Sequence, residues 1–336
     1  MSHFNPWQWL PADIKRQLPN ILADKIEADC HGVKVLSDGL SNQNFHIALS
    51  DSDWVLRVNQ DNAPWCERDN EVSSWRLVEA INRAPKLIWL SDDKRFYLSQ
   101  FIPENNHLWS NYVAEFSFYD NKRPQQSVFA ALDPVAHLLG LLTPLSKLPL
   151  PTKQITMTQQ WQVYVNSLSD LGNSIADASV ANKGDADETQ ALVTWQQLYR
   201  KLTSKYAQMA IWLEQLETCV ISPQFCHRDL SPYNLLFDGK QLKCIDFEYC
   251  AASHPLFDLV AVVVTHQLTQ EQVKQLTEKY LQHQLNLTYD CTDYLAEMAH
   301  CFWLFAAAWA LMMAANQQLS PQQYFNLFNK YLSLVP

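Results

Sequence analysis

Alternation of apolar and polar residues predicts a strand-rich segment in the N-terminal third of the chain. A helical pattern over residues 11–28, opened by Pro11 and Asp13, comes first, and the hydrophobic period then changes to two. A helix is predicted over 66–81, and period-two runs predict strands over 33–36, 45–49, 54–58, 86–90 and 95–101. The pattern therefore predicts a small antiparallel sheet with one inserted helix.

From residue 103 onward the pattern is mainly helical. Helices are predicted over 127–142, 159–170, 191–217, 256–266, 269–284, 291–316 and 321–333. The stretch 171–190 has few large apolar residues, which predicts a loop. A short β patch is predicted around the Asp238-Gly239 turn. The expected fold class is therefore α+β, with a β-rich N-lobe over 1–101 and a mainly helical C-lobe over 102–336.

Glycine is scarce, which excludes two common nucleotide-binding motifs. The 336 residues include six glycines, and no two of them have the spacing of a G-x-G or a G-x-x-x-x-G motif. A Rossmann fingerprint and a Walker A loop both need clustered glycines so that main-chain N–H groups can approach phosphates. A phosphate-binding function in this chain therefore requires a different structural solution.

The net charge of −10 narrows the class of partner. Nucleic-acid-binding surfaces depend on Lys and Arg side chains that neutralise phosphates, so this charge balance argues against nonspecific nucleic-acid binding. An acidic surface fits a cationic small-molecule substrate, although most acidic surfaces serve only solubility. The expected partner is therefore a small molecule, and the sequence leaves the oligomeric state open.

Cysteine spacing and the N-terminal sequence predict a cytoplasmic protein. The eight cysteines include no C-x-x-C pair, and residues 1–6 show no basic segment followed by an apolar run. Scattered thiols without an export signal are typical of a reducing compartment. The longest apolar run, Cys301 to Ala315, has fifteen residues, fewer than the roughly 18 of a membrane span, so a buried core helix is predicted.

One motif in the C-terminal half carries the chemistry. His227, Asp229 and Asn234 form the pattern H-x-D-x-x-x-x-N, and Asp246 follows in a predicted apolar strand. Phosphoryl transfer depends on positioning and on neutralising phosphate charge. A carboxylate at Asp229 can orient an acceptor hydroxyl and accept its proton, while the oxygens of Asn234 and Asp246 suit Mg²⁺. The alternative interpretation is a capped turn before a strand, a common use of Asp and Asn.

These residues resemble the kinase-like phosphotransferases of the aminoglycoside phosphotransferase and choline/ethanolamine kinase group. The resemblance covers most of the chain and is strongest around 225–260. It implies a two-lobed, protein-kinase-like fold that binds ATP between the lobes. By this resemblance Asp229 is the catalytic aspartate, and Asn234 and Asp246 are the magnesium ligands. His227 and Asp258 are expected to support the catalytic loop.

The same resemblance extends to the N-lobe. The segment Gly39-Leu40-Ser41-Asn42-Gln43-Asn44-Phe45 is similar to the phosphate loop of the group, where Ser41, Asn42 and main-chain amides would face the phosphates. Arg57 stands where protein kinases have lysine, and its forked guanidinium can hold phosphates. Glu71 on the following helix is placed to form an ion pair with Arg57. The alternatives are an ordinary hairpin turn at the loop and a solvated helix charge at Glu71.

The resemblance also implies a hinge between the lobes. Leu98 to Pro103 is similar to the segment in which main-chain groups contact adenine, near Gln100 and Ile102. Tyr233 departs from the pattern of the group, which usually has glycine there, so the loop backbone is expected to differ at this position.

Aromatic residues are the candidates for binding the acceptor. Asp246-Phe247-Glu248-Tyr249 has the form typical of choline, ethanolamine and bacterial thiamine kinases, and aromatic faces can hold quaternary ammonium groups. Tyr249 and Trp303 match the acceptor positions of the group, and Tyr324 and Trp309 are looser candidates. In the alternative interpretation, Trp303 and Trp309 simply pack in the core.

Together these features predict an ATP- and Mg²⁺-dependent small-molecule kinase that phosphorylates a hydroxyl of choline or a related amino alcohol. Choline kinases usually have tryptophan where this chain has Ala306, so a larger or flatter acceptor such as thiamine is the nearest alternative. An aminoglycoside or sugar kinase is a further alternative, disfavoured by the few carboxylates in the C-terminal helices. Outside enzymes, the alternative is a kinase-shaped binding protein.

Overall fold

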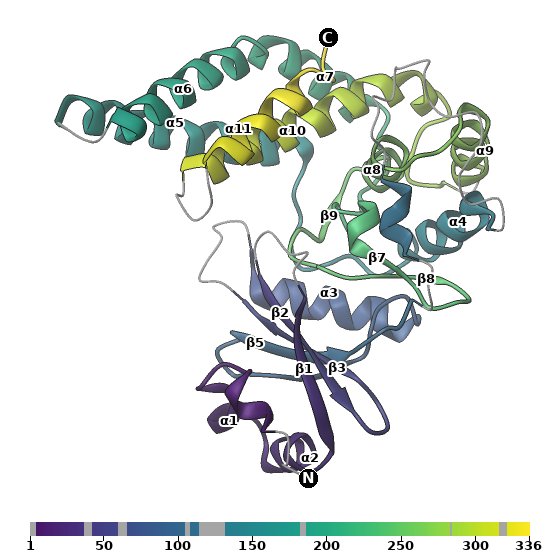
Figure 1. Cartoon of the computed structure of the whole chain (residues 1–336). Helices are drawn as coiled ribbons and strands as arrows, with labels where there is room; N and C mark the ends of the chain where they lie inside the picture. Colours follow the sequence, from purple (N-terminus) through teal and green to yellow (C-terminus); the bar gives the residue numbers. More distant parts are fainter. Residues whose placement is uncertain are drawn as a thin grey trace. The chain divides into compact units, whose positions relative to one another are not determined.

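The computed structural model divides into two compact units. It describes residues 5–36, 42–59, 66–104, 108–113, 132–181, 186–282, 284–315 and 321–336 (Figure 1). The first unit comprises Met1–Asn111 and Pro232–Cys250, and the second comprises Tyr112–Ser231 and Ala251–Pro336. The first contains an antiparallel sheet and the second is mainly helical, as expected for the predicted α+β class.

A five-stranded antiparallel sheet organises the first unit. Its strand order is β1-β2-β3-β5-β4, and all five predicted strands are confirmed with bounds that differ by no more than three residues. The strands are β1 (Cys30–Leu36), β2 (Gln43–Leu49), β3 (Trp54–Val58), β4 (Leu87–Leu90) and β5 (Phe96–Gln100). Alternate residues of β2, namely Phe45, Ile47 and Leu49, are buried in the core on one face of the sheet.

The predicted helix over 11–28 is wrong in one respect, because it is two helices. After a 3₁₀ turn, η1 (Pro6–Gln8), the chain forms α1 (Ile14–Gln17) and α2 (Asn20–Asp29). Leu18 has φ −65° and ψ 140°, an extended conformation that the following Pro19 imposes on its neighbour. Ile14 and Ile26 still pack into the core beneath the sheet.

The hairpin after the catalytic motif belongs to the first unit. It consists of η3 (Pro232–Asn234), β7 (Leu235–Phe237) and β8 (Leu242–Cys244). The N–H of Cys244 donates to the carbonyl of Arg83 (2.8 Å), just beyond α3 (Arg68–Ala80), the helix predicted over 66–81. The units of the structure therefore differ from the predicted division at residue 101. The first unit extends to Asn111, within η2 (Trp109–Tyr112), and includes this hairpin.

Helices form most of the second unit. The described helical elements are α4 (Pro134–Leu145), α5 (Met157–Ala181), α6 (Ala186–Thr203), α7 (Tyr206–Thr218), α8 (Phe257–Thr265), α9 (Gln270–Leu281), η4 (Cys291–Tyr294), α10 (Leu295–Ala315) and α11 (Pro321–Leu332). Two short strands, β6 (Gln224–Cys226) and β9 (Ala251–Ser253), pair antiparallel. With three residues each, they lack the alternation that identifies a strand in a sequence.

The predicted loop over 171–190 is wrong, because α5 continues to Ala181 and α6 begins at Ala186. Alanine is the best helix former, and tertiary packing can override the weaker helix propensity of the Gly, Ser, Asn and Asp residues in this stretch. Leu168 on α5 and Trp195 and Leu202 on α6 are buried and anchor the two helices. The helix predicted over 127–142 begins at Pro134, where the Asp133 side chain caps the N-terminus; residues 127–131 lie outside the described residues.

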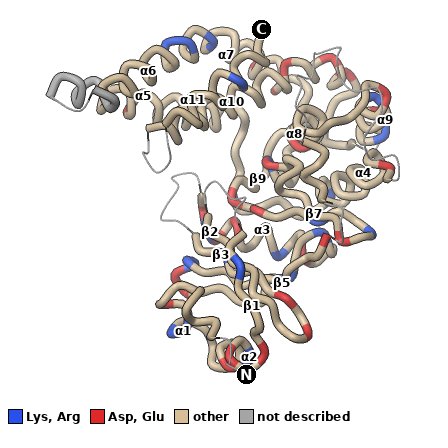
Figure 2. The backbone as a smooth tube through the Cα atoms, viewed as in Figure 1, with Lys and Arg blue, Asp and Glu red and all other residues tan. Residues whose placement is uncertain are grey.

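The apolar run near the C-terminus lies in a long helical stretch. Over the described residues, Cys291–Ala315 is the one helical segment long and apolar enough by length and composition to cross a membrane. Of its most apolar window, 67% is buried within the protein, and α10 packs against α5, α6, α7, α8 and α11. Charged residues are sparse along α10 and α11, which carry Glu297 and Lys330 (Figure 2). The burial favours the predicted core helix.

Candidate active site

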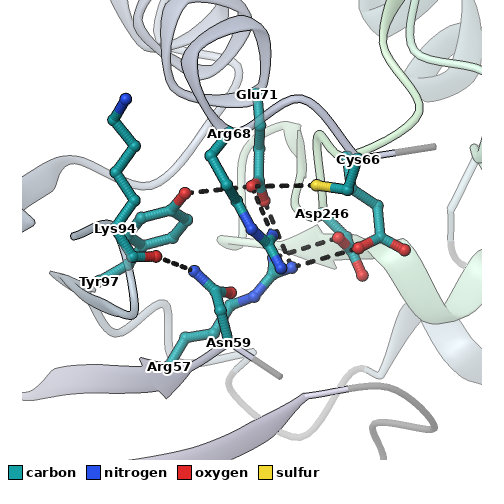
Figure 3. Close-up of polar contacts among 9 residues, drawn as sticks. Arg57, Asn59, Cys66, Arg68, Glu71, Lys94, Tyr97 and Asp246 are labelled. Carbon is teal, nitrogen blue, oxygen red and sulfur yellow. Dashed lines mark hydrogen bonds and ion pairs between the residues drawn. The ribbon is translucent and has the colours of Figure 1, made fainter. Parts of the chain in front are cut away.

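Arg57 and Glu71 form an ion pair in the interior of the first unit. Arg57 lies on β3 and Glu71 on α3, and Nη2 is 3.3 Å from Oε1. The Glu71 side chain is 0% exposed, and it also accepts hydrogen bonds from Arg68 Nη1 (2.7 Å) and the Tyr97 hydroxyl (3.1 Å) (Figure 3). The predicted ion pair is therefore confirmed, and a solvated helix charge at Glu71 is excluded.

Two further carboxylates contact the same guanidinium. Arg57 Nη1 is 3.1 Å from Asp246 Oδ1 (Figure 3), and Nη2 is 3.6 Å from Glu248 Oε2. Burial alone would lower the pKa of Arg57, but Asp246, Glu71 and Glu248 outweigh it and raise the pKa. The contact between Arg57 and Glu248 was not predicted from the sequence. The only feature that could have indicated it is the position of Glu248, two residues after Asp246.

Asp246 has an unusual backbone conformation. Its φ is +68°, in the left-handed region that residues with a side chain rarely adopt. Such a conformation persists only where the surroundings impose it, and it is concentrated at functional sites. Here the N–H of Ile245 donates to the carbonyl of Asn234 (3.0 Å), and Leu235 pairs with Cys244. Asn234 and Asp246 are therefore held at the same end of the β7–β8 hairpin.

The donor chemistry at this end of the hairpin fits Mg²⁺. The Asn234 amide and the Asp246 carboxylate offer oxygen ligands, which this hard cation prefers. Among the described residues, no group of three or more His, Cys, Asp or Glu is arranged to hold a metal. That is compatible with Mg²⁺, since this ion is commonly held by one or two protein side chains together with substrate phosphates.

Part of the predicted phosphate loop contacts Arg57. With its amide oxygen facing the guanidinium, Asn42 accepts hydrogen bonds from Arg57 Nη2 (2.7 Å) and Nε (3.3 Å). The predicted residue Ser41, together with Gly39 and Leu40, lies outside the described residues. The structure therefore brings Asn42 to the Arg57 cluster, and the role of Ser41 stays a prediction.

The predicted hinge, Leu98 to Pro103, begins in the last residues of β5 and continues beyond its end at Gln100. The N–H of Gln100 donates to the carbonyl of Lys86 (2.9 Å), and that of Phe101 donates to Asp53 (3.0 Å). Sheet pairing thus already uses the N–H of Gln100. Ile102, two residues after Gln100, is buried. Contact of these two positions with adenine stays a prediction.

The catalytic-loop motif in the second unit is anchored by Asp258. Asp258, in the first turn of α8, accepts hydrogen bonds from the main-chain N–H groups of His227 and Arg228, both at 2.8 Å. Arg228 has φ +71° and also donates to Gln160 Oε1 (3.2 Å). Burial raises the pKa of Asp258 to about 6, although the two hydrogen bonds oppose this. The expected supporting contact of Asp258 is therefore present, His227 is fully buried, and Asp229 follows, half-buried.

The aromatic candidates for acceptor binding separate into two pairs. Trp303 on α10 is 8% exposed and stacks on Tyr331 of α11, with ring centroids 5.5 Å apart and an angle of 20°. Tyr324 is 1% exposed and meets Trp309 edge-on at 5.9 Å. Tyr324 therefore lies beside Trp309, and the ring stacked on Trp303 is Tyr331, which was not among the predicted candidates. Tyr249, half-buried, belongs to the first unit.

Sequence reasoning missed Tyr331 because α11 carries two tyrosines, Tyr324 and Tyr331. Tyr324 and Tyr331 are seven positions apart, two helical turns, and share a helix face. Their pattern predicts a buried face for both but does not identify which tyrosine meets Trp303. That depends on how α11 packs along α10.

Known proteins resemble this chain in sequence and in fold. The model of the phosphotransferase enzyme family matches residues 32–297. A choline/ethanolamine kinase family protein from Mesorhizobium loti has a TM-score of 0.63, 17% identity, and a match over 96% of this chain and 93% of its own. For choline kinase LicA from Streptococcus pneumoniae the TM-score is 0.61 and the identity 13%, over 94% of this chain and 97% of its own.

At such identities the structural likeness establishes a shared fold, in agreement with the predicted kinase-like α+β architecture. Protein LicA of Haemophilus influenzae is 38% identical over 55 residues, which are 16% of this chain and 21% of that protein. The chain thus matches about a fifth of the length of this relative. The family match confirms the resemblance predicted from the sequence and the predicted enzyme class, a phosphotransferase. The chain belongs to the phosphotransferase enzyme family.

Proposed function

We propose that the protein is an ATP- and Mg²⁺-dependent kinase that phosphorylates a hydroxyl of choline or a related amino alcohol. The observation that carries the proposal is the Arg57 cluster. A buried guanidinium contacts Asn42 of the predicted phosphate loop, Glu71, and the predicted metal ligand Asp246. A cation able to hold phosphates and a carboxylate able to hold Mg²⁺ thus belong to one network, as phosphoryl transfer requires.

In the proposed reaction Asp229 orients the acceptor hydroxyl and accepts its proton. The hydroxyl oxygen forms a bond to the γ-phosphorus, and the bond from that phosphorus to the β-phosphate oxygen breaks. The products are the phosphorylated alcohol, ADP and a proton that resides first on Asp229. Asp258 supports this step indirectly, because it fixes the two main-chain N–H groups that precede Asp229.

Asn234 and Asp246 are the proposed holders of Mg²⁺, which when bound neutralises charge on the transferred phosphate. Arg57 and the N–H groups of the 39–42 loop are the proposed phosphate contacts. Because Arg57 is anchored by Glu71, its guanidinium needs little reorganisation to meet a phosphate.

The stacked pair Trp303 and Tyr331 supports a cationic acceptor. Aromatic rings attract ammonium groups through their quadrupole, with an effect of about 0.5–2 kcal/mol per ring. The few carboxylates on α10 and α11 disfavour a polycationic aminoglycoside. The similar fold of a choline kinase gives additional support for choline itself.

One observation favours thiamine as the second candidate acceptor. The Trp303 Nε1 group is buried and has no hydrogen-bond partner among the described residues. A buried donor without a partner is costly. A ring nitrogen of a heterocyclic acceptor can accept this hydrogen bond, whereas a quaternary ammonium group cannot.

A screen for ATP consumption tests the proposal. The full chain is incubated with ATP and Mg²⁺ and one of choline, ethanolamine, thiamine, kanamycin or a simple sugar, and ADP release is followed. We expect turnover with choline or ethanolamine, and turnover with thiamine alone would establish the second candidate. No turnover with any acceptor, together with no ATP binding by calorimetry, would leave the kinase-shaped binding protein as the better explanation.

A further inference from the structure

The cluster around Arg57 contains more carboxylates than cations. Three carboxylates, Glu71, Asp246 and Glu248, contact Arg57. A second cation, Arg68, contacts Glu71 (Figure 3). Three negative and two positive charges leave this cluster with a net charge of −1. Since the Arg57 and Glu71 side chains are 10% and 0% exposed, solvent screens these interactions weakly.

Glu71 would keep partners if Arg57 moved, whereas Asp246 would not. Arg68 Nη1 (2.7 Å) and the Tyr97 hydroxyl (3.1 Å) both donate to Glu71 Oε2. Over the part of the chain that the structure describes, Arg57 is the single cation within ion-pair distance of Asp246. The charge of Asp246 is therefore balanced by Arg57, unless another cation takes its place.

A metal ion and a guanidinium do not share this carboxylate easily. Arg57 Nη1 is 3.1 Å from Oδ1, one of the two carboxylate oxygens that Asp246 can offer to a metal ion. A divalent ion bound by this carboxylate would lie close to the guanidinium, and the two positive charges would repel each other strongly in a weakly screened environment. Nucleotide phosphates would remove the conflict, because their oxygens can accept the hydrogen bonds that Arg57 now gives to Asp246.

We infer that Arg57 competes with the divalent metal ion for Asp246, so that the metal binds weakly alone and tightly together with the nucleotide phosphates. Arg57 is in this respect a positioning residue that couples two ligands. The inference rests on the proposed function, in which Asp246 is a metal ligand. The inference goes beyond that function, because it makes the Arg57–Asp246 ion pair the reason that the metal ion binds together with the nucleotide and not before it.

Metal titration without nucleotide tests the inference. Mn²⁺ binding is followed by electron paramagnetic resonance, and Mg²⁺ binding by calorimetry, for the unchanged full chain and for Arg57→Gln. We expect Arg57→Gln to bind the metal about tenfold more tightly, because its neutral amide does not compete for Asp246. Equal or weaker binding would overturn the inference, since it would mean that Arg57 is neutral toward the metal or helps to orient Asp246 for it.

Arg68→Gln is the matched control. It also removes one positive charge from the cluster, but Arg68 contacts Glu71 and not Asp246. A general increase in negative field would tighten metal binding equally in both variants and contradict direct competition. The double variant Arg57→Gln/Asp246→Asn should lose the gained affinity, and retention of that affinity would place the metal elsewhere.

Arg57→Lys guards against loss of folding in Arg57→Gln, because it keeps the charge. Lysine is a point charge without a fork, so its metal affinity should lie between those of the unchanged chain and Arg57→Gln. Circular dichroism verifies the fold of each variant. Failure of the kinase proposal would appear in the ATP screen of the unchanged chain. Failure of this inference would appear as equal metal affinity of Arg57→Gln and the unchanged chain, while the unchanged chain turns over ATP.

Discussion

Arg57 on β3 and Asp246, 189 positions further along the chain, are joined by a 3.1 Å contact between Nη1 and Oδ1. The pair joins the sheet to the hairpin that carries the predicted metal ligands, all within the first unit. Because Glu71 anchors the other side of the guanidinium, a change at any of these charges should affect both stability and ligand binding.

Replacing Asp229 should remove the chemistry while preserving the fold. Asp229→Asn keeps the shape of the side chain but cannot accept the hydroxyl proton, so kcat should fall by about 10²–10⁴-fold. The measurement is ADP release at saturating acceptor, together with the melting temperature. The exposed Asp293→Asn in the same unit is the control and should keep its rate. Turnover by Asp229→Asn at the unchanged rate would contradict the proposed role.

Replacing Glu71 should destabilise the first unit. Glu71→Gln removes the negative charge that pairs with the buried Arg57 and the half-buried Arg68, at a cost of about 3 kcal/mol in the free energy of unfolding. Glu278→Gln breaks an exposed ion pair with Lys274 and should cost less than about 0.5 kcal/mol. Urea denaturation measures both. Similar costs for the two variants would mean that the buried network contributes no special stability.

Removing the Trp303–Tyr331 stack should weaken acceptor binding. We expect Tyr331→Ala and Trp303→Ala to raise KM for choline by about 2- to 30-fold, the range of one cation–π contact, with little change in KM for ATP. Tyr289→Ala is the control, since Tyr289 is 98% exposed. Unchanged KM values for choline in both variants would mean that Trp303 and Tyr331 only pack in the core. Trp303→Phe, which keeps an aromatic ring but removes the indole N–H, should affect thiamine more than choline.

His254 should make the protein sensitive to acid. Its Nδ1 accepts a hydrogen bond from the N–H of Leu256 (3.1 Å), and Nε2 lies 3.1 Å from the carbonyl of Leu216, which fixes the neutral tautomer with the proton on Nε2. Burial lowers the pKa of His254 to about 4 from its ordinary value of 6.5. The unfolded chain therefore binds the proton first, and stability present above pH 6.5 is lost as the pH falls toward 4.

The loss assigned to His254 is about 3 kcal/mol across that window. His254→Gln should be less stable at pH 7 but should lack this part of the acid dependence. The free energy of unfolding at several pH values between 7 and 4, compared with the unchanged chain, measures it. Parallel pH profiles for the two proteins would show that His254 does not contribute.

Local patterns determined the elements of the sheet, because burial on one face forces period-two alternation whatever the neighbours are. The same local chemistry accounts for the break at Pro19, where the signal was present in the sequence but was outweighed by the helical period. The helical segments 171–181 and 186–190, where a loop was predicted, were missed for a different reason. Their small residues have little periodicity, and packing by Trp195 and Leu202 stabilises them.

Residue types and spacing also determined the family and the chemistry of the site. The motif of Asp229, Asn234 and Asp246 led to the phosphotransferase family that the family match confirms, while the roles of these residues toward the hydroxyl and Mg²⁺ stay predictions. The partner of Arg57 on the neighbouring helix followed from the element order. The contacts of Arg57 with Asp246 and Glu248 could not be predicted, because no local pattern relates residues about 190 positions apart.

The sequence by itself thus specified the strands, the catalytic motif and the class of enzyme, all of which depend on residue type and local spacing. Only the tertiary structure decided that three carboxylates share Arg57 and that Tyr331, not Tyr324, stacks on Trp303. The physical reason is that such contacts depend on how β3 meets the β7–β8 hairpin and on how α11 packs along α10. Those arrangements result from packing of the whole core, and each element alone is compatible with several of them.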